Sequence, residues 1–292
     1  MPNAIVVTGC DANHHDLAAD LLASLKAITP RPFATGFINI GAGPLPEAIA
    51  SAVDAVVEIA DEAFAAMGGR GFRLGYLGVK PSLPRLFPGY DIYVWMDADT
   101  WVQNAAGLDA YLHCARLADI AAAPESDRSY FQVEQPSRYL LEVYNGLLGP
   151  EAMHAYGRLP MINTGVFSAV AASPLWAAWE EALRALREAP PAGAATWFSD
   201  QIPLHRLVHS GALTLHPLSA VNNWLVSMRP PSINTDTGRV CAPTWPHEEI
   251  NIIHLTGASK DWRFPVGGGG DTSLRYSEVR ARFAPAGEAP RG

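Results

Sequence analysis

Short apolar runs alternate with amphipathic stretches along most of the chain. Apolar runs rich in β-branched residues predict strands over residues 4–9, 35–43, 55–61, 92–96, 119–125 and 161–169. Apolar positions at helical spacing predict helices over residues 17–27, 46–53, 105–118 and 174–189, with Asp16 placed to cap the first. Strand–helix–strand alternation of this kind predicts an α/β fold built on a mostly parallel sheet.

Two parts of the chain break this pattern. Residues 126–160 contain the helically periodic run RYLLEVYNGLL, which predicts an inserted helical hairpin. Near the C-terminus, the run GGGG and the Pro/Ala/Gly-rich end predict a flexible tail over residues 266–292. The sequence therefore predicts a single domain over residues 1–265.

Composition and charge narrow the classes of partner. Hydrophobic residues make up 49% of the 292 residues and charged residues 17%, which is typical of a globular protein with a large core. The formal net charge of −8 argues against nucleic acid as a partner, although a small anionic ligand needs only a local cluster of donors.

Cysteine usage and the N-terminal segment bear on the compartment. Cys10, Cys114 and Cys241 show no CxxC spacing, so we expect reduced thiols in the core. The N-terminal segment has no basic region followed by a long apolar run. No stretch approaches the ~20 apolar residues that span a bilayer. We therefore expect a cytoplasmic protein without a transmembrane segment.

Two aspartates follow the strand predicted over residues 92–96. Asp97 and Asp99 are separated only by Ala98, so both carboxylates point to the same side if the strand continues. Two carboxylates on one face repel each other, so either one is protonated or a cation lies between them. The alternative is a solvated acidic turn, but the preceding apolar run places the pair at the mouth of a core. Carboxylate oxygens suit Mn²⁺ or Mg²⁺, which commonly keep phosphate oxygens as further ligands.

Two enzyme classes place an Asp-x-Asp at a strand end in this way. In aspartate-nucleophile phosphatases the signature is D-x-D-x-T, which DADT matches, with Asp97 as nucleophile and Asp99 as acid/base. In nucleotide-sugar glycosyltransferases the motif binds a metal and a diphosphate. The phosphatase motif is expected near the start of its domain, whereas about ninety residues precede it here, so its position favours the transferase. A non-catalytic protein that binds nucleotide sugars or glycans is a third hypothesis.

A second strand end supplies candidates for the same site. His254 closes the run INIIH, where a lone imidazole is more often structural than a ligand. The segment HLTGASKDW, which begins with His254, favours a functional role for this histidine. Gly257 permits close backbone approach, and Lys260 supplies an ammonium. Together these groups would neutralise a departing diphosphate.

For two further pairs of residues, the sequence does not decide between a structural role and a functional one. Asn163 and Gly165 in MINTGVF indicate either a strand with a bulge at glycine or a contact to a substrate hydroxyl. Asp200 and Gln201 lie at a predicted helix start, where a capping role and an active-site role are equally compatible with the sequence.

Taken in order, these segments resemble the family 8 retaining glycosyltransferases, and the glycogenin-like members most closely. The matching segments span about residues 4–262: VTGCDANHHDLAADLLASL, VKPSLPRLF ahead of YVWMDADTWV, DIAAAPE, INTGVF, SDQ and HLTGASKDW. The resemblance implies a glycosyltransferase A-type nucleotide-binding fold with a mixed, mostly parallel central sheet flanked by helices. It also implies metal-dependent, retaining transfer of a sugar from a nucleotide-sugar donor, a UDP-sugar, to a hydroxyl acceptor.

The resemblance further implies roles for individual residues. Mn²⁺ (or Mg²⁺) would be bound by Asp97, Asp99 and His254, and Asp200 and Gln201 would lie beside the anomeric carbon as the catalytic pair. Contacts to the donor would come from Thr8, Asp11, Asn13, His14, Lys80, Asp97, Ala98, Asp99, Asn163, Gly165, Gly257 and Lys260.

The sequence departs from the family pattern at two positions. Asp261 replaces the proline of the usual Lys-Pro-Trp, which places a carboxylate beside the diphosphate lysine. His14 follows Asn13 where the family has an aromatic ring that stacks on the base, so the base is less firmly specified. Residues 126–160 have no counterpart in the resemblance, so we expect acceptor choice to lie there. Glycan, lipid-linked, small-molecule and protein acceptors all stay open, as does the oligomeric state.

Overall fold

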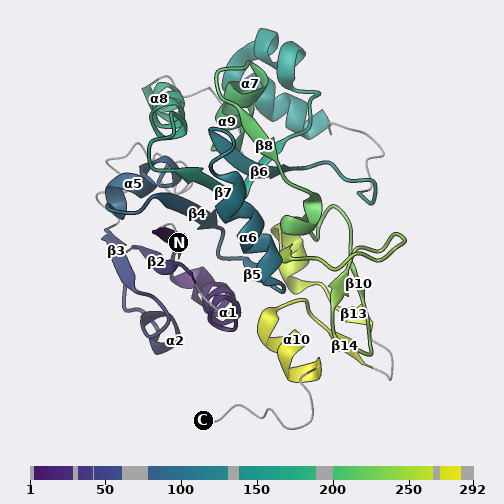
Figure 1. The fold of residues 1–292 in the computed structure, drawn as a ribbon. Coiled ribbons are helices and arrows are strands. Elements are labelled where there is room, and N and C mark those ends of the chain that lie inside the picture. Colours follow the sequence, from purple (N-terminus) through teal and green to yellow (C-terminus); the bar gives the residue numbers. More distant parts are fainter. Residues whose placement is uncertain are drawn as a thin grey trace.

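A mixed sheet forms the centre of the molecule (Figure 1). The structure, a computed structural model, describes residues 3–28, 32–41, 43–60, 78–130, 138–188, 200–265 and 270–283. Within them, seven strands lie in the order β3-β2-β1-β4-β7-β6-β8. Their bounds are Ala4–Cys10 (β1), Ala34–Ile40 (β2), Ala55–Ile59 (β3), Ile92–Met96 (β4), Ile120–Pro124 (β6), Ile162–Val170 (β7) and Leu215–Pro217 (β8). Of these strands only β7 runs antiparallel to its neighbours, so the predicted mostly parallel sheet is confirmed.

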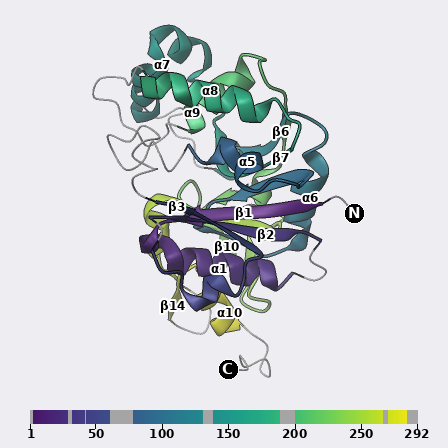
Figure 2. The same cartoon turned by 90° about the vertical axis from the view of Figure 1, so that its left-hand side faces the viewer.

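Helices cover both faces of this sheet. One face packs against α1 (His15–Lys26), α2 (Glu47–Ala50) and α6 (Ala105–Cys114), and the other against α5 (Leu83–Leu86), α8 (Leu175–Glu188) and α9 (Gln201–His209). In Figure 2, α1 runs alongside β1 and β2. Successive strand residues point to opposite faces, so Val6 and Val94 lie in the core under α1 while Val7 and Trp95 lie under α8. Burial on both faces explains why these strands are continuous apolar runs in the sequence.

Each predicted strand and helix has a counterpart in the structure, with shifted ends; the terminal residues Asp61 and Ala189 lie outside the described residues. The predicted cap of the first helix is wrong. A 3₁₀ turn, η1 (Ala12–His14), precedes α1, and the side chain that caps it is Asp11, which accepts from the Asn13 backbone N–H at 3.0 Å. Asp16 lies inside the first turn of α1 and binds Arg275 at 2.6 Å.

A smaller sheet continues the chain beyond β4. Its strands β5 (Thr100–Val102), β12 (Ile252–His254) and β9 (Trp224–Leu225) lie in the order β5-β12-β9. Because β12 pairs antiparallel with β5, His254 lies opposite Thr100, at the turn that follows β4. The remaining elements are η2 (Lys80–Ser82), α7 (Arg138–Tyr156), η4 (Ala220–Asn222), β10 (Ser232–Ile233), β11 (Val240–Cys241), η5 (Gly257–Asp261), β13 (Phe264–Pro265), β14 (Asp271–Thr272) and α10 (Tyr276–Phe283).

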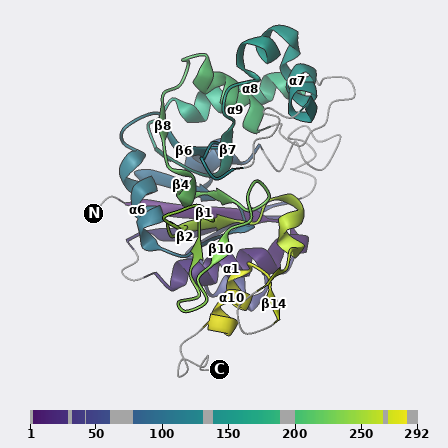
Figure 3. The ribbon, with the colours of Figure 1, turned by 90° about the vertical axis from the view of Figure 1, so that its right-hand side faces the viewer.

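Residues 270–283 of the predicted flexible tail contain defined elements, whereas residues 266–269 and 284–292 lie outside the described residues. Within residues 266–292, β14 and α10 fold against the body of the molecule, and α10 lies near α1 in Figures 1 and 3. The Trp101 indole donates to the Leu274 carbonyl at 2.7 Å, and Ser277 bonds Asp20 on α1. No local apolar period indicates this packing, because the contacts are made with α1 and β5.

The predicted helical hairpin corresponds to α7, whose two segments meet at a non-helical Gly149 with φ 82° followed by Pro150. The first segment packs on α9 through an apolar cluster that includes Tyr144, Leu147 and Ile202. An acceptor role for residues 126–160, and a single-domain organisation, stay predictions.

The three cysteines are buried and free, as expected. Among the helices described, none is both long enough and apolar enough to cross a bilayer.

His205 on α9 makes the stability of this packing depend on pH. Burial, with the nearby His209 ring, lowers the pKa of His205 from 6.5 to about 4. The unfolded chain therefore binds more protons between these values, and the free energy of unfolding falls as pH falls through this window, by up to about 3 kcal/mol.

We expect His205→Gln to show a shallower fall in the free energy of unfolding than the wild type between pH 6.5 and 4, measured by urea denaturation. His113→Gln, on the exposed side of α6, is the matched control and should keep the wild-type slope. Equal slopes in all three proteins would contradict the assignment.

Candidate functional site

Asp97 and Asp99 lie in a tight turn between β4 and β5 rather than on a continuing strand. The Asp97 carbonyl accepts from the Thr100 N–H at 3.0 Å and from the Thr100 hydroxyl at 2.7 Å. Ala98, between the aspartates, is buried in the core under α1. The turn, not strand alternation, brings the two carboxylates to the same place.

His254 joins these carboxylates from β12. One ligand atom from each of Asp97, Asp99 and His254 lies within 4.8 Å of the others, and the His254 Nε2 is 3.2 Å from Asp99 Oδ1. Gly165 on β7 makes room for the imidazole: a Cβ there would lie 2.2 Å from His254 Cε1. The Gly165 carbonyl also accepts from the Asp97 N–H at 2.7 Å. The glycine is therefore required by the close approach of His254, and the predicted bulge is not the reason for it.

Lys80 forms an ion pair with Asp97 in this turn. Its ammonium is buried, and it lies 3.1 Å from Asp97 Oδ1 and 3.0 Å from Asp200 Oδ2. It also donates to the carbonyl and the hydroxyl of Thr164 at 3.1 and 3.3 Å. Burial alone would lower the pKa of Lys80, but Asp200 and Asp97 outweigh it and the pKa is raised. The lysine therefore stays charged, and it links η2, β4, β7 and the start of α9.

The two aspartates differ in their electrostatic surroundings. Burial raises the pKa of Asp97, helped by the charge of Asp99 and opposed by Lys80. Burial also acts on Asp99, but His254 and Lys260 overcome it and hold the pKa of Asp99 well below its usual range. The Lys260 ammonium, carried by η5, lies 2.5 Å from Asp99 Oδ2. Each carboxylate thus lies beside its own lysine, but only at Asp99 do the neighbouring cations outweigh burial.

A chain of hydrogen bonds fixes the imidazole of His254. The Gly165 N–H can only donate, so the atom of Asn163 that faces it at 2.8 Å is Oδ1. The same Oδ1 accepts from Asn223 Nδ2 at 2.9 Å, which turns the Asn223 Oδ1 toward His254 Nδ1, also at 2.9 Å. His254 therefore carries a proton on Nδ1, and Nε2 is the nitrogen available to a metal.

The donor set fits a hard or borderline divalent cation. Two carboxylates and one imidazole nitrogen converge, and the hydrogen-bond chain presents the imidazole in the tautomer that a ligand requires. These are the three residues predicted to bind the metal, and the structure brings them together.

The predicted nucleotide contacts lie at the end of β1, beside this cluster. Asp11 orients His14 through a 2.9 Å contact to its Nδ1, in addition to capping η1. The Thr8 hydroxyl is buried without a hydrogen-bond partner among the described residues. Burial raises the pKa of Cys10, the last residue of β1, and the charges of Asp11, Asp16 and Asp99 add to the effect.

Other predicted residues have structural partners. Asp200 is buried and accepts from Lys80 and, at 2.9 Å, from the Thr164 hydroxyl, so it anchors the lysine. It has no side-chain bond that caps α9, unlike the capping alternative raised from the sequence. Gly257 begins η5 with φ +56°, a conformation that favours glycine. Asp261 is exposed at the end of η5.

Sequence analysis missed Glu125, Thr164 and Asn223 as members of this site. The Glu125 Oε1 accepts from Asn163 Nδ2 at 2.8 Å and from Gln201 Nε2 at 2.7 Å. Its place at the end of a predicted strand was a usable signal. Asn223 lies in an irregular segment whose sequence carries no such signal.

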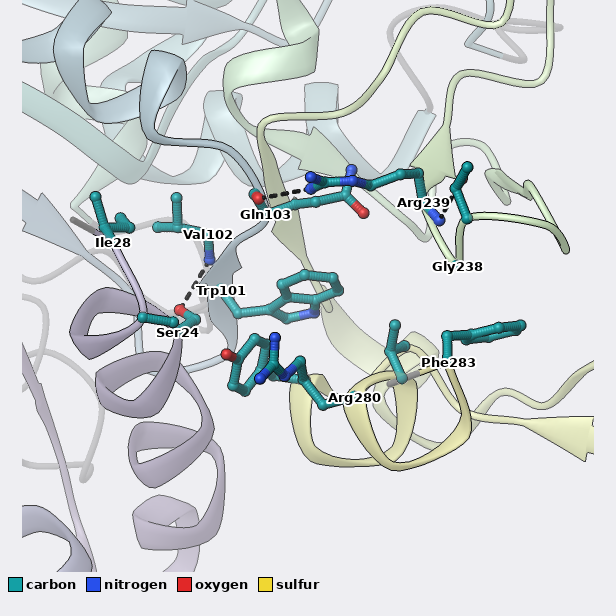
Figure 4. Close-up of a pocket in the computed structure, with 13 residues that line it drawn as sticks. Ser24, Ile28, Trp101, Val102, Gln103, Gly238, Arg239, Arg280 and Phe283 are labelled. Carbon is teal, nitrogen blue, oxygen red and sulfur yellow. Dashed lines mark hydrogen bonds between the residues drawn. The ribbon is translucent and has the colours of Figure 1, made fainter. Parts of the chain in front are cut away.

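A separate cavity of about 400 Å³ lies between α1, β5 and α10 (Figure 4). Trp101, Arg239 and Arg280 are among its lining residues, and none of the predicted site residues lines it. Within this lining, the Arg239 guanidinium donates to the Gln103 carbonyl at 3.0 Å. The acidic cluster is therefore a distinct site.

The fold is similar to that of solved glycosyltransferases at low sequence identity. The galactosyltransferase LgtC, in complex with donor and acceptor sugar analogs, matches with a TM-score of 0.58 and 15% identity over 97% of this chain and 98% of LgtC. The bifunctional glycosyltransferase WbbM gives 0.55 and 15% over 97% of this chain and 50% of its own. Mouse xyloside xylosyltransferase 1 gives 0.52 and 13% over 88% and 98%. These likenesses confirm the glycosyltransferase A-type fold. No protein-family model and no curated protein matches the sequence.

We expect Lys80→Met to lower the free energy of unfolding by about 3–5 kcal/mol, because it leaves Asp200 buried without its counter-charge. The double variant Lys80→Met/Asp200→Asn should recover part of this loss in urea denaturation at pH 7.5. Lys26→Met, exposed on α1, is the control. A loss no larger than that of Lys26→Met would contradict the role of this ion pair.

We expect Asn223→Ala to weaken Mn²⁺ binding about 10–100-fold, because His254 loses the acceptor that fixes its tautomer. Calorimetric titration of Mn²⁺ alone measures this, with the exposed Asn234→Ala as control. Wild-type Mn²⁺ affinity in Asn223→Ala would rule out the orienting role.

Proposed function

We propose that the protein is a metal-dependent glycosyltransferase that moves a sugar from a UDP-sugar to a hydroxyl acceptor with retention of anomeric configuration. The observation that carries the proposal is the convergence of Asp97, Asp99 and His254 at strand ends of a glycosyltransferase A-type fold. Ligands of open α/β sheets bind outside the carboxyl ends of the strands, where this cluster lies.

In this proposal the donor lies across the ends of β1 and β4. Asp11, Asn13 and His14, in the loop after β1, bind the nucleoside, and Asp97, Asp99 and His254 hold Mn²⁺ or Mg²⁺. Such a cation, when bound, acts as a Lewis acid on the diphosphate. Thr8, Ala98 and Lys80 complete the wall of the donor site.

Lys260 and the backbone at Gly257 stabilise the leaving group. The Lys260 ammonium lies 2.5 Å from Asp99 Oδ2, so it is within reach of an anion held at that carboxylate. An ammonium and backbone N–H groups aimed at a developing negative charge lower the barrier for its departure. The exposed Asp261 adds a negative charge next to this lysine, which weakens the effect.

The reaction exchanges one bond at the anomeric carbon for another. The bond from this carbon to the phosphate oxygen breaks, and its electron pair leaves with UDP. The acceptor oxygen bonds to the same carbon on the same face, and its proton passes to the departing phosphate. A front-face route of this kind suits the site better than a covalent one, because the Asp200 carboxylate is held by Lys80 and Thr164.

Gln201 is then the predicted catalytic residue that can face the sugar. It is the first residue of α9 and is held by Glu125. An active-site variant of LgtC replaces a glutamine by glutamate, so that protein also has a glutamine at its active site. In this proposal Asn163 and Gly165 also contribute to sugar binding. Their contribution depends on the position of the Asn163 side-chain amide, one hydrogen of which is bonded to Glu125.

The first test is calorimetric titration of UDP into the protein with Mn²⁺ and then with EDTA. The proposal expects binding that requires Mn²⁺, followed by slow hydrolysis of one member of a UDP-sugar panel. Binding without hydrolysis or transfer would indicate a non-catalytic nucleotide-sugar protein. Absence of UDP binding in both conditions would overturn the donor assignment and direct the search to GDP or to the phosphatase hypothesis, which fluoroberyllate trapping of Asp97 would test.

We expect Asp99→Asn to abolish turnover while the protein stays folded, because a carboxylate ligand of the metal becomes a neutral amide. Asp271→Asn, exposed on β14, is the matched control and should retain wild-type turnover. Retained activity in Asp99→Asn would rule out the metal assignment.

A further inference from the structure

Glu125 joins two parts of the site that are far apart in the chain. Its Oε1 accepts from Gln201 Nε2 at 2.7 Å and from Asn163 Nδ2 at 2.8 Å. The pairing register of β6 with β7 shifts between Ala122 and Pro124, and the Glu125 N–H then donates to the Met161 carbonyl at 2.7 Å. A register shift re-aims the side chains that follow it, which brings Glu125 between β7 and α9.

The chemistry of the carboxylate decides how the Gln201 amide is turned. An ionised carboxylate only accepts hydrogen bonds, so the atom of Gln201 that faces it is the amide nitrogen. The carbonyl oxygen of the same amide then points away from Glu125. A glutamine without such a partner could present either its oxygen or its NH₂ group, which are nearly equal in size and opposite in polarity.

The same carboxylate also begins the chain that ends at His254. Asn163 is fixed at both ends of its amide, by Glu125 at the nitrogen and by the Gly165 N–H at the oxygen. Asn223 and the proton on His254 Nδ1 follow from that orientation. Glu125 therefore orients Gln201 on the sugar side and, together with the Gly165 N–H, supports the orientation of Asn163 on the metal side.

We propose that Glu125 is a positioning residue that fixes the Gln201 carboxamide so that its oxygen, and not its NH₂ group, is presented to the sugar. This inference rests on the proposed function. Positive charge develops at the anomeric carbon as the bond to UDP breaks, and a carbonyl oxygen stabilises it while an NH₂ group opposes it. Glu125 acts through Gln201 and takes no part in bond making.

The kinetic test compares Glu125→Ala with Glu125→Gln. The alanine variant removes the acceptor, and we expect kcat for UDP-sugar hydrolysis to fall about 100-fold with KM for the donor unchanged. The glutamine variant keeps an oxygen that accepts both hydrogen bonds, so it should retain most of kcat. Glu47→Ala, exposed on α2, is the matched control. A Glu125→Gln variant as slow as Glu125→Ala would overturn the proposal, since the charge would then matter and the acceptor geometry would not.

A double-mutant cycle tests whether Glu125 acts through Gln201. If it does, Glu125→Ala/Gln201→Ala is no slower than Gln201→Ala alone, because the group being positioned is already absent. Multiplicative losses of the two single variants would overturn the proposal.

A measurement without substrate separates this inference from the proposed function. The chain has four glutamines, so amide-¹⁵N-glutamine labelling gives four side-chain signals in an NMR spectrum, and Gln201→Ala assigns that of Gln201. We expect the Gln201 signal to move in Glu125→Ala and to stay near its wild-type position in Glu125→Gln. Gln103, which bonds the Val240 and Ile250 carbonyls, reports that the fold is intact.

The NMR measurement and the activity measurement distinguish failure of this inference from failure of the proposed function. A Gln201 signal that ignores Glu125→Ala, with Gln103 unchanged, overturns the inference whatever the activity is. Wild-type protein that neither binds UDP nor hydrolyses any UDP-sugar overturns the proposed function, and the NMR result then decides the orientation of Gln201 by itself.

Discussion

The buried ammonium of Lys80 is the interaction on which the arrangement of the site depends. A lysine removed from water keeps its charge only where carboxylates and carbonyls replace the solvent. Asp97, Asp200 and Thr164 do so here, and they come from the turn after β4, the start of α9 and β7. These elements must therefore be correctly placed relative to one another before the Lys80 ammonium has all of its partners. The geometry of this edge of the sheet is thus coupled to the stability of the core beneath it.

This constraint divides the site into a fixed half and a ligand-binding half. The fixed half is the Lys80 ion pair with Asp200, which is buried and saturated with hydrogen bonds. The half proposed to bind the ligand is Asp99 with His254 and Lys260, where the surrounding charges keep the carboxylate ionised. Asp97 belongs to both halves. A turn that carries two carboxylates separated by a single residue is stable here because a lysine ammonium lies beside each of them.

Much of the fold was predictable from the sequence, because strands buried on both faces and amphipathic helices leave periodic patterns. The long strands and helices were found in this way. Strands of two residues, such as β9 and β11, leave no period to detect, and β5 has only three residues. The ordered segment at β14 and α10 was missed for another reason: its partners, Trp101 and Asp20, lie more than a hundred residues earlier in the chain.

By itself the sequence determined the chemistry of the site: two carboxylates at a strand end, an imidazole at another, and a lysine within reach of each part. The order of those segments also carried the resemblance that led to the fold. Tertiary structure alone decided what each group does. Asp200 was an equal candidate for a helix cap and for catalysis until Lys80, 120 residues away, became its partner. Glu125 entered the site through hydrogen bonds with Asn163 and Gln201, 38 and 76 residues away, and Asn223 through hydrogen bonds with Asn163 and His254, 60 and 31 residues away. Periodic patterns record which face of an element is buried, whereas the partner of a polar side chain is set by packing between distant elements, which no local pattern records.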